Sequence, residues 1–110
     1  MKQYKMYLRV WEEYSSSGIW SIENPKQMTP VKMVSFQMLN LPQSLIKEFQ
    51  NWIDEFDNNL PFPPKDWDVK KFDDKGNELS QKLKNFLGDD YYVEREIVDG
   101  EYTEIQISTL

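Results

Sequence analysis

The sequence contains no cysteine and no histidine among its 110 residues. Without cysteine there can be no disulfide, thiol nucleophile, iron–sulfur cluster or thiolate zinc site. Without histidine there can be no Ser-His-Asp triad, no imidazole base and no imidazole metal ligand. Only carboxylates, lysine, tyrosine and backbone groups remain for catalysis, so we expect no catalytic residues, no cofactor and no bound metal.

Long apolar runs and glycine-rich loops are also missing. Residues 1–13 lack the apolar stretch of about 7–15 residues that a signal peptide needs. No segment has the roughly 18 consecutive apolar residues of a transmembrane helix. The four glycines form neither a P-loop nor a dinucleotide fingerprint. We therefore expect a soluble, cytoplasmic protein without a membrane contact.

Positive charge is scarce in the second half of the chain. Residues 1–50 hold six Lys/Arg and four Asp/Glu, a net charge of +2, whereas residues 51–110 hold seven and fifteen, a net charge of −8. An acidic surface repels phosphate backbones and anionic membranes, and it favours a basic protein partner. Acidity of this size is also typical of a small protein that is simply kept soluble.

Aromatic residues are abundant, with four Trp, six Tyr and six Phe. A chain of this length buries about two thirds of the surface that unfolding exposes, so we expect one domain spanning residues 1–110. The patterns predict an α+β fold, in which two antiparallel helices cover one face of an antiparallel sheet. The predicted order is three strands, two helices and two strands. In that order the segments are residues 4–11, 19–22, 32–39, 42–57, about 66–88, 91–98 and 101–107.

The two helices have the clearest periodicity. Leu45, Phe49, Trp52, Ile53 and Phe56 recur at helical spacing and predict an amphipathic helix after Pro42.

The second helix is expected to start at an N-cap of Asp66 or Asp68 and to end at Gly88. Gly76 either lies inside this helix or belongs to a turn over residues 73–77, and we favour the longer helix.

The last two strands read as a hairpin. Asp99-Gly100 is a strong signal for a two-residue type I′ turn, which needs positive φ at both positions. That turn places Arg95 opposite Glu104 and Glu94 opposite Ile105.

Acidic side chains of the second half are the best candidates for partner binding, because such a surface can steer a basic protein into contact. Trp11 and Trp67 sit among polar residues, and tryptophan is enriched at binding hot spots. The predicted partner-binding residues are Asp54, Glu55, Asp57, Trp67, Asp73, Asp74, Glu78, Glu94, Glu96 and Glu104.

Other functions remain open at this level. Carboxylate pairs such as Asp54 with Asp57 could perform acid–base hydrolysis if one acid were buried with a raised pKa. A non-catalytic adaptor or oligomerisation module is a third possibility. The run Asp73-Asp74-Lys75-Gly76 only faintly matches a calcium loop, because its glycine and glutamate have the wrong spacing.

The order of residues over about 18–96 resembles small bacterial immunity proteins of contact-dependent growth inhibition and related polymorphic toxin systems. The matching features are Trp20-Ser21, the helix that opens at Leu41-Pro42, Phe72-Asp73 with Gly76, Leu87-Gly88, and Tyr92-Val93. The resemblance implies a protein without catalysis that binds and neutralises one cognate toxin domain. Together with the acidic half, it predicts a basic nuclease as that toxin.

Overall fold

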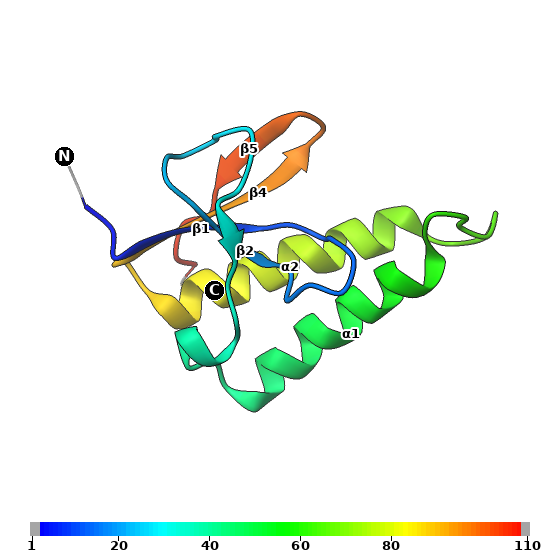
Figure 1. The fold of residues 1–110 in the computed structure, drawn as a ribbon, viewed down its shortest axis with the longest axis horizontal. Coiled ribbons are helices and arrows are strands. Elements are labelled where there is room, and N and C mark those ends of the chain that lie inside the picture. Colours follow the sequence, from blue (N-terminus) through cyan, green and yellow to red (C-terminus); the bar gives the residue numbers. More distant parts are fainter. Residues whose placement is uncertain (1–2, 109–110) are drawn as a thin grey trace.

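The computed structural model describes residues 3–108, and residues 1–2 and 109–110 lie outside the description. Figure 1 shows two long helices side by side, both on one face of a sheet. The sheet has five strands in the order β3-β2-β1-β4-β5. The predicted α+β fold is therefore confirmed. The elements are β1 (Met6–Val10), β2 (Ile19–Ile22), β3 (Lys32–Met33), the 3-10 helix η1 (Gln37–Leu39), α1 (Gln43–Asn59), α2 (Val69–Leu87), β4 (Tyr91–Val98) and β5 (Glu101–Glu104).

Both helices begin and end close to where their local signals place them. Pro42 directly precedes α1. The Asp68 carboxylate accepts a hydrogen bond from the Lys71 backbone N–H, 2.9 Å away, and so caps α2. Gly88 ends α2 with a φ of +85°. Gly76 lies inside α2, which confirms the longer of the two predicted helices.

The core lies between the helices and one face of the sheet. Leu8 and Val10 of β1 and Val93 of β4 point into it and are fully buried. Trp52 of α1 stacks on Phe72 of α2 with ring centroids 5.0 Å apart, and its indole N–H donates to the Phe72 carbonyl. Each such buried apolar side chain contributes about 1.5–3 kcal/mol by leaving water.

The third strand is much shorter than the sequence predicts. Residues 32–39 alternate in hydrophobicity, but only Lys32–Met33 pair with β2. The Ser35 hydroxyl then accepts a hydrogen bond from the Met38 N–H and turns the chain into η1. Val34 is buried as expected, whereas Met38 is exposed. A local side-chain bond to the backbone has replaced the strand.

The centre of the sheet is parallel, although a wholly antiparallel sheet was expected. β1 and β4 run in the same direction, with Arg9 beside Glu94 and Val10 beside Arg95. The other three strand pairs are antiparallel. Parallel neighbours require a long connection, and the chain between β1 and β4, which contains β2, β3 and the α1–α2 pair, supplies it.

The register of the final hairpin also differs from the prediction. Gly100 has a φ of +81°, but Asp99 is not in the positive-φ region, so the turn is not type I′. An irregularity between Glu96 and Val98 adds a residue to β4 and shifts the pairing by one. Arg95 therefore lies opposite Thr103, and Glu94 lies opposite Glu104.

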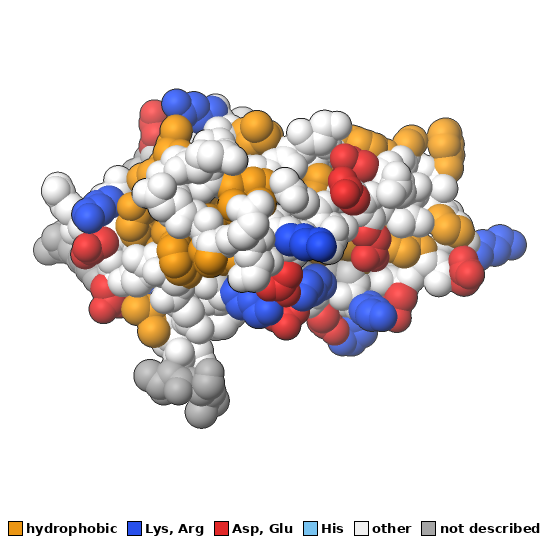
Figure 2. All heavy atoms as spheres, turned by 90° about the horizontal axis from the view of Figure 1, so that it is seen from below, with side chains coloured by type: hydrophobic (Ala, Val, Ile, Leu, Met, Phe, Trp, Pro, Cys, Tyr) orange, Lys and Arg blue, Asp and Glu red, His pale blue; other side chains and the backbone are white. Residues whose placement is uncertain are grey.

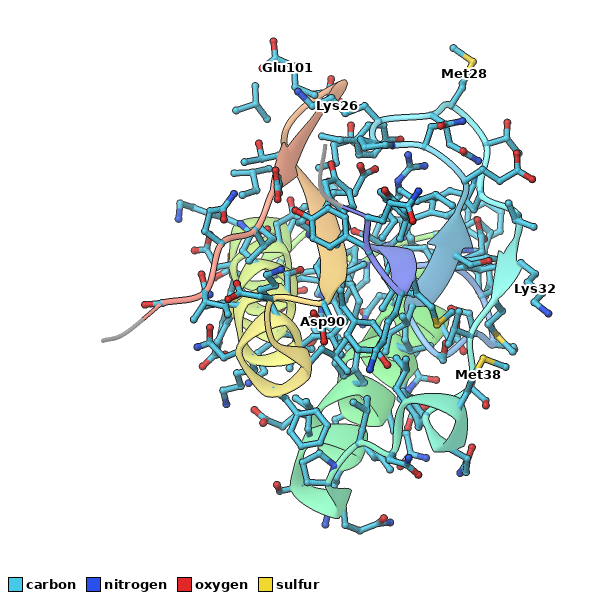
Figure 3. The ribbon with its side chains drawn as sticks, turned by 90° about the vertical axis from the view of Figure 1, so that its left-hand side faces the viewer. Lys26, Met28, Lys32, Met38, Asp90 and Glu101 are labelled. Carbon is cyan, nitrogen blue, oxygen red and sulfur yellow. The ribbon has the colours of Figure 1, made fainter. Side chains whose placement is uncertain are left out.

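Residues 23–31, the connection between β2 and β3, which we name the capping loop, contact the second face of the sheet at Arg9 and Glu94; Lys26 and Met28 mark this loop in Figure 3. Gln27 organises this loop, since its side-chain oxygen accepts hydrogen bonds from the Glu23 and Asn24 N–H groups. Neither α1 nor α2 has the length and apolar character needed to cross a bilayer.

Candidate functional site

The fold places seven of the ten predicted partner-binding residues in the groove between the helices, in a hollow where α2 meets β4, or on the second face of the sheet, and leaves Asp54, Asp57 and Trp67 outside these places. Burial and pairing decide which of these carboxylates can meet a partner.

The interhelical groove has a volume of about 580 Å³ and is floored by Trp52. Predicted acids line it, but most are engaged within the chain. Asp74 pairs with Lys70 at 2.7 Å and Glu78 pairs with Lys75 at 2.8 Å. The groove residues are Glu48, Asn51, Trp52, Glu55, Lys71, Asp74, Lys75 and Glu78.

Glu48 shows how strongly the charges of this groove are compensated. Its carboxylate accepts hydrogen bonds from Lys75 and Lys82 at 2.7 and 2.9 Å. Those bonds lower the pKa of Glu48 and raise the pKa of Lys75. Seen from below Figure 1, acidic and basic side chains are intermixed in the centre and right of the molecule, and hydrophobic side chains gather at the left (Figure 2). The groove is thus a mixed-charge surface.

The second place, which we name the acidic hollow, has a volume of about 330 Å³ and collects four carboxylates around one guanidinium. Asp73 and Asn77 come from α2, and Arg95 and Glu96 come from β4. The lining residues are Glu12, Asp73, Asn77, Arg95, Glu96, Ile97 and Asp99.

Arg95 is only 3% exposed, and its donors point into the protein. It donates to the Glu12 carboxylate at 2.8 Å, the Asn77 amide oxygen at 3.1 Å and the Val10 carbonyl at 3.3 Å. Its Cζ atom also lies 5.1 Å from the centroid of the Trp52 ring. The guanidinium is therefore used mainly to join β4, β1 and the helices.

Asp73 at the rim of the hollow has a raised pKa. The largest cause is partial desolvation, followed by repulsion from Glu12, and Arg95 offsets only part of this effect. Asp74 and Glu96 add further repulsion. Uncompensated negative potential therefore concentrates here, and the hollow can accept hydrogen bonds from an incoming lysine or arginine.

The third place changes the expectation for Glu94. This residue is completely buried, with its Oε2 2.7 Å from Nε of Arg9, which is 1% exposed. Its other oxygen accepts hydrogen bonds from the Tyr92 hydroxyl at 3.0 Å and the Lys26 backbone N–H at 2.7 Å. Burial and the Glu94 charge raise the pKa of Tyr92. Glu94 thus does not belong to the exposed acidic surface that was predicted.

Arg9 is held from several elements. Besides Glu94 on β4, it donates to the Gln27 carbonyl of the capping loop, and its Cζ lies 3.8 Å from the centroid of the Tyr102 ring on β5. The role of Arg9 was not predicted from the sequence. The only local signal was an arginine between Leu8 and Val10 in a predicted strand, which does not say whether its side chain is solvated or buried.

The other predicted residues lie at the surface or in local contacts. Asp54 is exposed. Asp57 accepts a hydrogen bond from the Ser15 N–H at 3.1 Å, and Glu55 accepts one from the Trp67 indole at 2.9 Å. The Trp67 ring also packs on Phe72, with centroids 5.3 Å apart, so it is partly used by the fold.

Two further observations concern metal binding and the position of Glu104. Among residues 3–108, no three Asp or Glu side chains are grouped so that they could hold a metal ion. Glu104 of β5 receives a long 3.4 Å hydrogen bond from the Tyr4 hydroxyl, on the second face of the sheet rather than in the hollow.

A family of protein sequences, described as Serratia CdiI immunity protein-like, matches residues 6–95. This match includes Arg9, both helices, Glu94 and Arg95. The chain belongs to this family. As a CdiI-like immunity protein it has an immunity function against a toxin of contact-dependent growth inhibition, and the family suggests an inhibitor without catalysis. No curated protein matches the sequence.

The match to the CdiI-like family covers only part of the molecule. The match begins at the first residue of β1 and ends inside β4, so it contains the buried ion pair and the α1–α2 pair. The end of β4, the turn and β5 lie outside it. The acidic hollow lies across that boundary, because Arg95 is the last matched residue and Glu96, Ile97 and Asp99 follow it.

Proposed function

We propose that this protein neutralises its cognate toxin by binding it through the exposed acidic surface, and that the toxin is a basic nuclease. The family match supports the immunity role. The acidic hollow is the single structural observation that favours electrostatic recognition, since its four carboxylates meet only one, already engaged, guanidinium.

The proposed mechanism follows from charge. A nuclease presents lysine and arginine side chains where it binds phosphates, so an acidic protein surface can occupy the same cleft. Opposite charges would steer the two proteins together and accelerate their association. The immunity protein would then exclude the nucleic acid by covering the cleft, with no bond made or broken.

Asp73 supports this interpretation, because its carboxylate is disfavoured in the free protein. Its neighbours Glu12 and Glu96 repel it and its water is partly removed. A lysine or arginine of the toxin would relieve that repulsion. Such a residue costs stability in isolation and gains its favourable interaction only in a complex.

Co-expression tests the immunity role. The toxin domain encoded beside this gene should stop growth when expressed alone and should be tolerated when this protein is present. Purified toxin should cleave DNA or RNA, and an equimolar amount of this protein should stop cleavage. Unprotected cells would overturn the immunity role, and a toxin that cleaves neither nucleic acid would overturn the nuclease assignment.

Salt and one substitution test the acidic surface. The association rate should fall as ionic strength rises from about 0.05 to 0.5 M, because screening shortens the range of attraction. Asp73→Asn should slow association by roughly 3- to 10-fold. Asp89→Asn makes the same charge change beyond the far end of α2, since the helix rises about 21 Å between Asp73 and Leu87 at 1.5 Å per residue, and it should leave the rate within about twofold. A salt-independent rate would contradict electrostatic recognition.

A further inference from the structure

The tip of the β4–β5 hairpin, residues 96–104, has an unusual combination of exposed apolar and acidic side chains. The extra residue in β4 falls between Glu96 and Val98. Ile97 and Val98 are 47% and 58% exposed. Figure 1 shows the hairpin rising away from the helices at the top of the molecule. Two adjacent aliphatic side chains thus stand in water at the end of a projecting element.

Negative charge surrounds these two residues. Glu96, Asp99, Glu101 and Glu104 all lie in the tip, and residues 96–110 contain no lysine or arginine. Glu96 is used to fix the turn, because its carboxylate accepts a hydrogen bond from the Gly100 N–H at 2.6 Å. Asp99 and Glu101 are exposed. All charged side chains of the tip itself are therefore negative, and Lys26 of the capping loop is the basic residue that lines the groove beside Glu101.

Hollows border the tip on two sides. The acidic hollow reaches it through Ile97 and Asp99. A second groove, of about 650 Å³, lies between β5 and the capping loop and is lined by Lys26, Met28 and residues 100–104. Figure 3 shows Lys26 and Glu101 next to each other where this loop meets the hairpin. A partner that encloses the tip would find concave surface on both sides.

The family match ends at the base of this hairpin. The match to CdiI-like proteins ends at Arg95, so the tip lies in the part of the chain that the family pattern does not describe. Recognition of one particular toxin cannot be made entirely from features that a whole family shares. The tip lies outside the matched region, and its exposed side chains at Ile97, Val98, Asp99 and Glu101 are accessible to a partner.

We propose that the hairpin tip is the element that inserts into a basic cleft of the toxin and determines which toxin is bound. In the complex, Asp99 and Glu101 pair with lysine or arginine side chains of the cleft, and Ile97 and Val98 pack against apolar surface within it. This proposal rests on the proposed function, because it assumes that the partner is a basic toxin domain.

Two double variants separate the two parts of this contact. Asp99→Asn with Glu101→Gln should weaken toxin binding at least about tenfold and flatten its salt dependence, because charge is removed. Ile97→Ser with Val98→Ser should weaken binding at least about tenfold through faster dissociation, as loss of a buried apolar anchor does.

Matched controls carry the same changes elsewhere. Asp66→Asn with Asp89→Asn removes two exposed acids outside the tip, and Val69→Ser with Phe86→Ser removes two apolar residues that are 51% and 48% exposed on α2. Both controls should bind within about threefold of the unaltered protein. Circular dichroism and thermal unfolding of all four variants establish that the fold is intact before binding is measured.

The outcomes separate this proposal from the proposed function. An unaltered protein that does not bind the purified toxin overturns the proposed function. An unaltered protein that binds, with either tip variant indistinguishable from its control, overturns the role of the tip alone. Loss of affinity in both tip variants, with both controls retained, supports it.

Discussion

Arg95 of β4 lies directly against Gly76 of α2, so closely that a Cβ atom at position 76 would stand 2.5 Å from Nη2 of the guanidinium. The same Cβ would stand 2.5 Å from Cζ2 of Trp52. Glycine at this position lets the helix approach both side chains. The contact joins α1, α2 and β4 at one point, beneath the acidic hollow.

Gly76→Ala should therefore destabilise the protein, although alanine is the better helix former by about 1 kcal/mol. Trp52 is rigid and Arg95 is tied to Glu12, so neither can move freely, and overpacking of this kind costs about 1–3 kcal/mol. Chemical denaturation measures the change. Gln50→Ala, at an exposed position of α1, serves as the control and should alter the free energy of unfolding by less than about 0.5 kcal/mol. An unchanged or increased stability of Gly76→Ala would contradict the close contact.

Two ion pairs of equal length allow a direct test of how burial changes the stability lost when an ion pair is broken. Arg9–Glu94 and Lys70–Asp74 both have N–O distances of 2.7 Å, but the first is buried and the second is exposed. Glu94→Ala should cost about 3–5 kcal/mol, since it leaves a buried charge unpaired. Asp74→Ala should cost less than about 1 kcal/mol. Denaturant titration of both variants provides the comparison, and equal losses would contradict the assignment.

The double variant Arg9→Met with Glu94→Leu gives a further check on the buried pair. It should be more stable than Glu94→Ala, because no isolated charge remains. It also removes the acceptor of the Lys26 N–H. Amide hydrogen exchange should therefore be faster in the capping loop than in the unaltered protein.

Replacement of Asp73 should increase the stability of the protein in a pH-dependent way. Its pKa is higher in the folded protein than its ordinary value of 3.8, so folding stability falls as pH rises through that interval and stays lower at neutral pH. Asp73→Asn should raise the free energy of unfolding at pH 7 by up to about 1 kcal/mol, since the site is largely exposed. Below about pH 3.8 the difference should vanish. Thermal unfolding across pH measures it, and a loss of stability at pH 7 would contradict the prediction.

Replacement of Glu48 should have the opposite effect on folding stability. Lys75 and Lys82 lower its pKa below the ordinary value of 4.5, so its contribution is present above that pH and is lost as pH falls through the folded value. Glu48→Gln should reduce stability at pH 7 by about 0.5–1 kcal/mol. The reduction should shrink in acid and in high salt. A constant difference from neutral to acidic pH would instead indicate a loss of packing.

The helices were predictable because their signals are local. The spacing of Leu45, Phe49 and Trp52 defines a buried face without reference to the rest of the chain. Asp68 and Gly88 mark the ends of α2 through local capping, by a side-chain carboxylate and by a positive φ. The acidic character of the second half is likewise a matter of composition. Whether those acids bind a toxin is still a prediction.

Strand pairing was less predictable because partners come from distant parts of the chain. Arg9 and Glu94 are 85 residues apart in sequence, and alternation within each strand does not reveal that β1 and β4 are parallel neighbours. The same pairing hides Glu94, which looked like any other acid of the hairpin. The irregularity near Ile97 shifts the final register, and the Asp99-Gly100 signal by itself does not disclose it.

The hairpin is anchored on both sides of its tip. Before the tip, Arg95 is bound to Val10 and Glu12, and after it Ile105 returns to the core and donates its N–H to the Val93 carbonyl at 2.8 Å. The exposed side chains of the intervening stretch, at Ile97, Val98, Asp99 and Glu101, can therefore be substituted with little effect on folding. Under the proposed role of the tip, substitutions in this short hairpin could change which toxin is bound while the rest of the fold is retained.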